Sequence, residues 1–223
     1  MYIETPSVNL DKRKRKQYLA KGESVVMKPM EITNGIYEVG AIDWNIRDFH
    51  GYSTKQGTTY NSFLIIDEKI TLIDTVKAEF ADELLNNVSK IIDPKKIDLV
   101  ISNHTEMDHS GGLARVMHRI GEDKPLLCSK MGHKNLSQHF SQQWNYKPVE
   151  NGEKLSLGKR SLTFLETRML HWPDSMFTYL NEDKILFSSD AFGGFEKRIG
   201  GFAFAEAQTM LEKAAKEKGW AVG

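Results

Sequence analysis

The sequence is almost without cysteine, because Cys128 is the one cysteine among its 223 residues. A disulfide framework needs paired cysteines, and an all-cysteine zinc or rubredoxin-type iron site needs several of them. Neither can be built within this chain. A metal site here would have to use imidazole and carboxylate side chains, and the sequence offers seven histidines.

An excess of charge of one sign is also absent, since Lys plus Arg and Asp plus Glu both number 30. This balance argues against nucleic acid or an anionic membrane as the main partner. No apolar run approaches the roughly 18 residues of a membrane span, and the N-terminus has no apolar signal-peptide stretch. We therefore expect a soluble, cytoplasmic protein with neither nucleic acid nor membrane among its partners.

Short apolar runs alternate with segments of helical periodicity from Ile36 onward. Strands are predicted over residues 36–39, 60–66, 69–73, 97–102, 126–128, 161–166, 177–180 and 184–187. Helices are predicted over residues 80–92, 113–120 and 134–140. Interleaved strands and helices, with hairpins near the beginning and the end, predict an α/β (α+β) protein with mixed rather than purely parallel sheets.

The predicted strand 97–102 is followed by a polar loop that carries the metal-binding side chains His104, Glu106, Asp108 and His109. The carboxyl end of a buried strand is a common place for the site of an α/β protein. In extended backbone the first three side chains would project to one side, and the fourth would turn in as a helix begins. Gly111 and Gly112 let the backbone approach closely. Imidazole with carboxylate suits zinc, iron or manganese, so a metal site is predicted here.

This pattern resembles the signature of the metallo-β-lactamase superfamily, whose hydrolases typically carry His-x-His-x-Asp-His. Glu106 stands where those hydrolases have the second histidine, and glutamate there resembles the flavodiiron proteins, the oxygen and nitric oxide reductases. Four further segments resemble flavodiiron proteins, namely residues 43–52, 57–61, 169–175 and 189–193. The sequence is therefore identified as a member of that branch over about residues 30–194.

The resemblance implies a metallo-β-lactamase-like αββα sandwich over residues 31–194, incomplete after Asp190, with an N-terminal extension over residues 1–30. It also implies a di-iron centre with the ligands His104, Glu106 and His171 on one iron, Asp108 and His109 on the other, and Asp190 as the bridge. His50 matches a histidine that lies near the pocket in the family. It is expected either to support the site or donate a proton, or to be an ordinary surface histidine.

The sequence departs from the family in its histidines. The flavodiiron pattern has one more histidine ligand well beyond the bridging aspartate, and no histidine follows Asp190 here. The remaining histidines fall on or beside predicted helices, where such residues are usually exposed or structural: His118, His133 and His139. We therefore expect the second iron to keep Asp108, His109, Asp190 and water, and to bind more weakly.

The second departure concerns the flavin. Family members carry a C-terminal flavodoxin-like domain that holds FMN, and a domain takes roughly 100–150 residues. Residues 195–223 are too few for it, so we expect no complete FMN-binding domain in this sequence. Their predicted strand–helix pattern resembles the last unit of that domain, although an ordinary amphipathic terminal helix would have the same pattern.

The resemblance implies an oxidoreductase that reduces O2 to water or NO to nitrous oxide, and both reactions use the same ligand set. The electrons would come from a rubredoxin- or flavodoxin-type donor or an NADH reductase, and the family implies a homodimer. One alternative is a non-catalytic oxygen-binding or sensor protein, or a degenerate relative, which the missing flavin and histidine favour. Another is a hydrolase in which zinc activates water, against which Glu106 argues.

Overall fold

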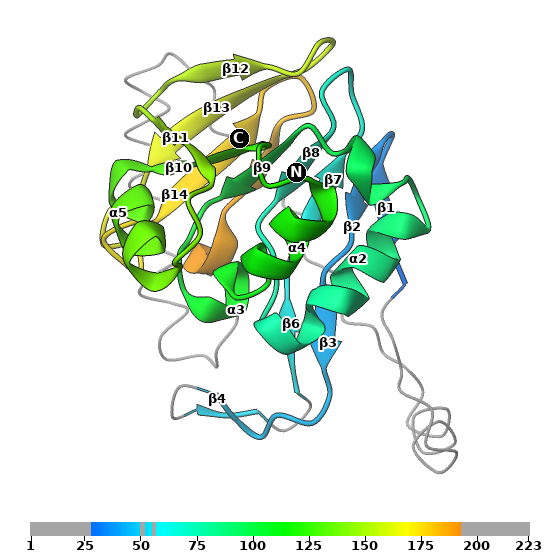
Figure 1. Cartoon of the computed structure of the whole chain (residues 1–223), viewed down its shortest axis with the longest axis vertical. Helices are drawn as coiled ribbons and strands as arrows, with labels where there is room; N and C mark the ends of the chain where they lie inside the picture. Colours follow the sequence, from blue (N-terminus) through cyan, green and yellow to red (C-terminus); the bar gives the residue numbers. More distant parts are fainter. Residues whose placement is uncertain (1–27, 50–51, 55–56, 193–223) are drawn as a thin grey trace.

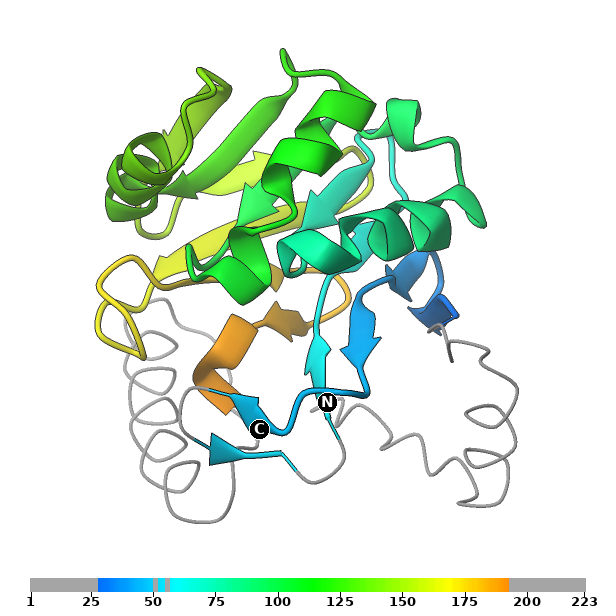
Figure 2. The same cartoon turned by 60° about the horizontal axis from the view of Figure 1, so that its bottom comes forward.

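The computed structural model describes residues 28–49, 52–54 and 57–192. In this part of the chain two β-sheets pack face to face (Figures 1 and 2), and helices α2 (Ala81–Ser89) and α4 (Leu113–Ile120) cover the outer face of the larger sheet. This is the layered arrangement of a metallo-β-lactamase-like α/β domain, as predicted. A second helical layer is not among the described residues.

The larger sheet is mixed, with the strand order β1-β2-β7-β8-β9-β10-β11. Its strands are β1 (Met30–Thr33), β2 (Ile36–Glu38), β7 (Phe63–Ile65), β8 (Thr71–Ile73), β9 (Leu99–Ser102), β10 (Pro125–Ser129) and β11 (Asn145–Val149). The first four of these pair antiparallel, and β8 to β11 pair parallel. The prediction of mixed sheets is confirmed.

The smaller sheet is an antiparallel meander in the order β12-β13-β14-β15. Its strands are β12 (Lys154–Ser156), β13 (Ser161–Glu166), β14 (Met176–Leu180) and β15 (Ile185–Phe187). Two short pairs form a ribbon that extends from the sandwich (Figure 1): β3 (Ala41–Asp43) with β6 (Thr58–Tyr60), and β4 (Asp48–Phe49) with β5 (Tyr52–Ser53).

The remaining helical elements lie in connections between strands, apart from the last of them, which follows the last described strand, β15. They are the helices α3 (Met107–Ser110) and α5 (Lys130–His139) and the 3-10 turns η1 (Ala78–Phe80), η2 (Pro94–Lys96) and η3 (Ser189–Phe192). Local sequence explains where two of them begin. Ser129 caps α5 by accepting the Gly132 N–H at 2.9 Å. Asp93 caps η2 in the same way, with Pro94 at the first position of the turn.

The core has two layers because the central strands bury both faces. Leu64, Leu72 and Val100 face the helices. The next residues along each strand point to the opposite face and pack against the smaller sheet: Ile65, Ile73 and Ile101. Burial on both faces explains why these strands are continuous apolar runs rather than alternating ones.

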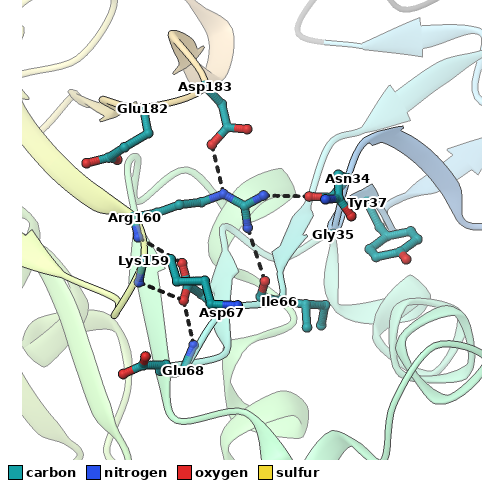
Figure 3. A pocket seen from close by; sticks show the side chains of 10 residues that line it. All are labelled: Asn34, Gly35, Tyr37, Ile66, Asp67, Glu68, Lys159, Arg160, Glu182 and Asp183. Atoms are coloured by element: carbon teal, nitrogen blue, oxygen red, sulfur yellow. Dashed lines mark hydrogen bonds and ion pairs between the residues drawn. The ribbon is translucent and has the colours of Figure 1, made fainter.

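Arg160 ties the two sheets together at one end of the sandwich (Figure 3). Its guanidinium donates to Asp183 Oδ2 at 2.8 Å, to Ile66 O at 3.2 Å and to Asn34 O at 2.6 Å. These partners lie in hairpin turns of both sheets, around a polar cavity of about 760 Å³. Strands β13 and β15 begin at this end and run toward the opposite one, so Arg160 holds the end remote from the residues that follow those strands.

The main elements agree with the sequence-based predictions, with the following corrections. The run 60–66 is divided, because β6 ends at Tyr60 and β7 begins at Phe63. The helix predicted over 134–140 begins at Lys130, where Ser129 supplies its cap. Strands β1, β11 and β12 were not predicted, since they are edge strands with exposed positions and weak apolar patterns. The short elements β3, β4, β5 and α3 were not predicted either.

The predicted division into residues 1–30, 31–194 and 195–223 stays a prediction. Most of the first segment and nearly all of the last lie outside the described residues, and so does the predicted strand–helix tail. Among the helices of the described part, none is both long and apolar enough to cross a membrane.

Candidate metal centre

Three segments that are distant in sequence bring histidines and carboxylates together at one end of the sandwich. The segment after β9 supplies His104 to His109, the loop between β13 and β14 supplies His171, and the turn η3 after β15 supplies Asp190. Their ligand atoms form two groups, each within 4.8 Å: His104, Glu106, His171 and Asp190 in one, and Asp108, His109 and Asp190 in the other. Asp190 belongs to both groups.

In the first group two imidazoles face one carboxylate oxygen. Glu106 Oε2 is 3.1 Å from His104 Nε2 and 3.2 Å from His171 Nε2. The two rings differ in burial: His104 is 1% exposed, whereas the side chain of His171 is 53% exposed. One side of this group is therefore sealed by the core, and the other side, at His171, is open to solvent.

In the second group the polar atoms are buried but incompletely hydrogen-bonded. His109 Nε2 lies 2.8 Å from Asp190 Oδ1 and 3.4 Å from Asp108 Oδ2. These are ion-pair distances, yet both ring nitrogens of His109 and Asp108 Oδ1 have no hydrogen-bond partner among the described residues. Buried polar atoms are nearly always satisfied. A cation shared by these side chains would satisfy them, so the donor set fits a metal ion.

The helix α3 separates the two groups, and this corrects one expectation. Glu106 is the last extended residue, and its carbonyl accepts the N–H groups of His109 at 3.0 Å and Ser110 at 2.8 Å. The alternation of extended backbone therefore stops there, and Asp108 does not share a side with His104 and Glu106. It joins His109 in the second group instead.

Close backbone contacts hold α3 in place. Thr75 donates to the His109 carbonyl from both its backbone N–H, at 2.8 Å, and its hydroxyl, at 2.6 Å. A Cβ atom on Gly112 would lie 3.0 Å from Val76 O, and one on Gly111 would lie 2.9 Å from Ala78 N. The expectation that this Gly-Gly pair permits close approach is confirmed.

The two ligands that are distant in sequence follow residues of left-handed backbone. Met169 has a φ of 65° and lies two residues before His171, and Ser189 has a φ of 49° and lies directly before Asp190. Residues other than glycine seldom adopt this conformation, and such strain gathers at functional sites. The loop of His171 is closed by a hydrogen bond from Thr167 N to Ser175 O at 3.0 Å.

The carboxylates make the site strongly attractive to positive charge. Burial would lower the pKa of His104, but the carboxylates of Asp174 and Glu106 raise it to about 10. Burial opposes protonation of His109 as well, yet Asp190 beside it raises that pKa to about 9. Burial would raise the pKa of Asp190, but the neighbouring histidines hold it below the ordinary value. The carboxylates that favour a proton on these rings would favour a metal cation in its place, for the same electrostatic reason.

Three large apolar side chains close to the ligands in sequence are exposed. Among the described residues, the large apolar residues with the greatest exposure are Met107 at 38%, Met169 at 70% and Trp172 at 38%. The Trp172 ring lies edge-on to the His104 ring, with the ring centroids 5.3 Å apart. We refer to Met107, Met169 and Trp172 as the apolar rim.

The other described histidines, His118, His133 and His139, belong to neither ligand group. His50 lies outside the described residues. His118 is an exposed residue of α4, 3.5 Å from Glu122. His133 and His139 are on α5, where His133 stacks against Tyr146 with ring centroids 4.7 Å apart. Their predicted placement on helices is confirmed.

The layered fold and the histidine–carboxylate site define this protein as a metallo-β-lactamase-like metal-binding domain. The family described as "ODP family beta lactamase" matches residues 58–216, and the chain belongs to this family. The relatives below confirm the resemblance to flavodiiron proteins.

Two curated reductases and one solved flavodiiron structure are similar to this chain. The "Nitric oxide reductase" of Moorella thermoacetica is 50% identical over 169 residues, which are 74% of this chain and 42% of that protein. The "Rubredoxin-oxygen oxidoreductase" of Megalodesulfovibrio gigas is 50% identical over 193 residues, 86% of this chain and 48% of that protein. The crystal structure of the flavodiiron protein from Giardia intestinalis has 34% sequence identity and a TM-score of 0.76, covering 85% of this chain and 52% of that one. The chain thus spans just under half the length of the two curated relatives.

Proposed function

We propose that this site is a di-iron centre. His104, Glu106 and His171 would hold one iron, Asp108 and His109 the other, and Asp190 would bridge them. The observation that carries the proposal is the membership of Asp190 in both ligand groups, each with its ligand atoms within 4.8 Å. A carboxylate has two oxygens and can therefore serve two ions at once.

The reaction we propose is the reduction of O2 to water or of NO to nitrous oxide. Two irons held by these side chains would supply redox chemistry and a paired binding site for a small molecule. The relatives named a nitric oxide reductase and a rubredoxin-oxygen oxidoreductase support this choice. So does Glu106, because a carboxylate in place of an imidazole adds negative charge, which favours the oxidised metals.

The protein side chains divide the remaining work by their burial. His104 and His109 form the sealed wall, at 1% and 4% exposed, and keep bulk water from that side. His171 lies at the open side, with 53% of its side chain exposed, where a diatomic substrate can enter. His50 is proposed as a proton donor or supporting residue on the family resemblance alone.

Electrons must come from another redox group, because reducing O2 to water takes more electrons than an Fe(II) pair holds. We propose that the donor docks at the apolar rim, since Trp172 contacts the exposed His171 ring and Met107 and Met169 are exposed within two residues of proposed ligands. A rubredoxin- or flavodoxin-type protein or an NADH reductase fits this role by resemblance, with FMN as an intermediate carrier and a homodimer as the working unit. Because a full-length relative has more than twice the residues matched here, we propose this donor, carrier and dimer for the whole protein.

Anomalous diffraction at the iron and zinc edges, combined with O2 and NO consumption under a reduced donor, tests the function. We expect two iron peaks flanking Asp190 and consumption of one of the gases. Zinc peaks together with ester hydrolysis would establish the hydrolase alternative instead. Iron without gas consumption, under a donor that supports a full-length relative, would favour the oxygen-binding or sensor alternative.

A further inference from the structure

The His104 ring is held between two carboxylates, one at each ring nitrogen. Its Nε2 is 3.1 Å from Glu106 Oε2, on the side of the ligand group. Its Nδ1 is 3.3 Å from Asp174 Oδ2, and the same oxygen accepts the Thr105 N–H at 2.8 Å. Asp174 itself belongs to neither ligand group.

The contact with Asp174 determines which ring nitrogen of His104 carries the proton. Asp174 Oδ2 faces His104 Nδ1 at 3.3 Å and already accepts the Thr105 N–H at 2.8 Å, so this oxygen acts as an acceptor. An ionised carboxylate only accepts hydrogen bonds. The proton of a neutral His104 ring is therefore on Nδ1, and the lone pair of Nε2 points toward Glu106 and the proposed metal.

The other two imidazoles lack this arrangement. His109 Nδ1 is buried without a hydrogen-bond partner in the described part of the chain. His171 meets Glu106 through its Nε2, and its side chain is 53% exposed. Among the described residues, no carboxylate lies within ion-pair distance of Nδ1 in either ring. His104 is therefore the histidine whose orientation is controlled by a second carboxylate.

Asp174 is rigidly held. It is 1% exposed, and its carbonyl accepts the Ser129 hydroxyl at 2.7 Å, where Ser129 also caps α5. The adjoining strand begins with a hydrogen bond from Met176 N to Asn103 O at 2.9 Å, next to His104. Because the Asp174 carboxylate is already fixed, it loses little conformational entropy when it orients the His104 ring. Its interaction with His104 Nδ1 is therefore not offset by such a loss.

We propose that Asp174 is a positioning residue of the metal centre, which fixes the tautomer and orientation of His104 and strengthens its Nε2 as a ligand. Because Asp174 lies three residues after His171 in the same loop, it also ties the loop of one imidazole ligand to the ring of another. The proposal rests on the proposed metal centre. Carboxylates behind metal-bound imidazoles act in this way, and losing one typically costs about 10- to 100-fold in metal affinity.

The test compares Asp174→Asn and Asp174→Ala with the wild-type chain and with Asp98→Asn. Asp98 is the matched control, because its carboxylate also accepts a backbone N–H, from Ile70 at 2.8 Å, but lies before β9 rather than after it. Affinities for Fe(II) and Zn(II) are measured by chelator competition without oxygen. The tautomer is read from long-range ¹⁵N–¹H NMR spectra of the zinc-loaded protein.

We expect about 10- to 100-fold weaker metal binding for both Asp174 variants and unchanged binding for Asp98→Asn. We also expect a protected His104 Nδ1–H signal in the wild type that is lost in Asp174→Ala. Unchanged affinity and an unchanged signal in a folded variant would overturn the proposal, as would an equal loss in the control. If Asp174→Ala fails to fold, the affinity of Asp174→Asn decides. A wild-type chain that binds no metal would contradict the centre itself, whereas tight wild-type binding with an unaltered Asp174→Asn variant would contradict the positioning role alone.

Discussion

The two ligand groups share Asp190 but are built differently. Asp108 and His109 are neighbours on one short helix, α3, and both are buried. The other group draws His104 and Glu106 from one loop and His171 from another, and is half open to solvent. One group therefore depends on a local turn of backbone, and the other depends on how two loops meet.

The groups also differ in what surrounds their imidazoles. His104 has Asp174 at its second ring nitrogen, 3.3 Å away, whereas His109 Nδ1 has no hydrogen-bond partner among the described residues. The group with the exposed ligand thus contains the ring that a carboxylate supports, whereas the sealed group contains a ring without such support. We expect the two metal positions to differ in affinity for this reason.

The largest expected effect comes from the shared ligand. Asp190→Ala should remove most of the iron, because both ions lose a carboxylate, whereas Asp108→Ala should remove mainly the ion of the second group. Iron per chain, measured by plasma mass spectrometry, gives the ranking. Asp82→Ala serves as the control, since Asp82 is an exposed partner of Arg115 away from the site. Equal losses, or a greater loss in Asp108→Ala, would refute the ranking.

A second change addresses the identity of the metal in the first group. Glu106→His restores the His-x-His-x-Asp-His pattern and replaces a hard anionic ligand with a neutral imidazole. We expect the ratio of zinc to iron in protein purified from cells to rise well above that of the wild type, because imidazole suits zinc. Glu68→His, in the exposed turn between β7 and β8 and away from the other histidines, is the control. A ratio that stays at the wild-type value would show that Glu106 does not select the metal.

Opposite pH dependences are expected for the metal-free and metal-loaded protein. The folded-state pKa values of His104, about 10, and His109, about 9, lie above the ordinary 6.5. Protonation therefore stabilises the metal-free fold fully below pH 6.5, and this contribution is lost as the pH rises through 9 and 10. Metal must displace these protons, so the stabilisation by metal should grow over the same range. Thermal unfolding at several pH values checks both slopes, and a metal-free protein that gains stability from pH 7 to 10 would disprove this account.

The smallest expected effect concerns the open side of the first group. Trp172→Ala should leave the iron content unchanged but weaken docking of the electron donor by about 1 kcal/mol, roughly fivefold. Stopped-flow reduction at varied donor concentration measures this change. Phe140→Ala, an aromatic truncation near α5 rather than at the apolar rim, is the control. Loss of iron in Trp172→Ala would mean that Trp172 supports the ligands rather than the donor.

Much of the fold could be predicted because its signals are local. The strands β9 and β13 and the helix α4 have continuous or periodic apolar residues, and they appear where predicted. The edge strands β1, β11 and β12 were missed, because half-exposed strands are stabilised by pairing with a neighbour rather than by a pattern of their own. The short helix α3 was missed because four residues are too few to show a helical period.

The site was predicted in part from the residues and in part from the resemblance. The run from His104 to His109 marked a metal site by composition alone, whereas His171 and Asp190 entered through likeness to flavodiiron proteins. Their meeting with the run agrees with that likeness. Asp174 received no role, although its place in the same segment as His171 was a usable signal.

The sequence by itself determined which atoms are available to bind metal and which class of fold carries them, because side-chain chemistry and apolar periodicity are properties of neighbouring residues. Tertiary structure decided that Asp190 serves both groups, that α3 turns Asp108 away from Glu106, and that Asp174 lies behind His104. These distances depend on how two sheets and their loops pack, and packing joins residues whose separation along the chain carries no local signal.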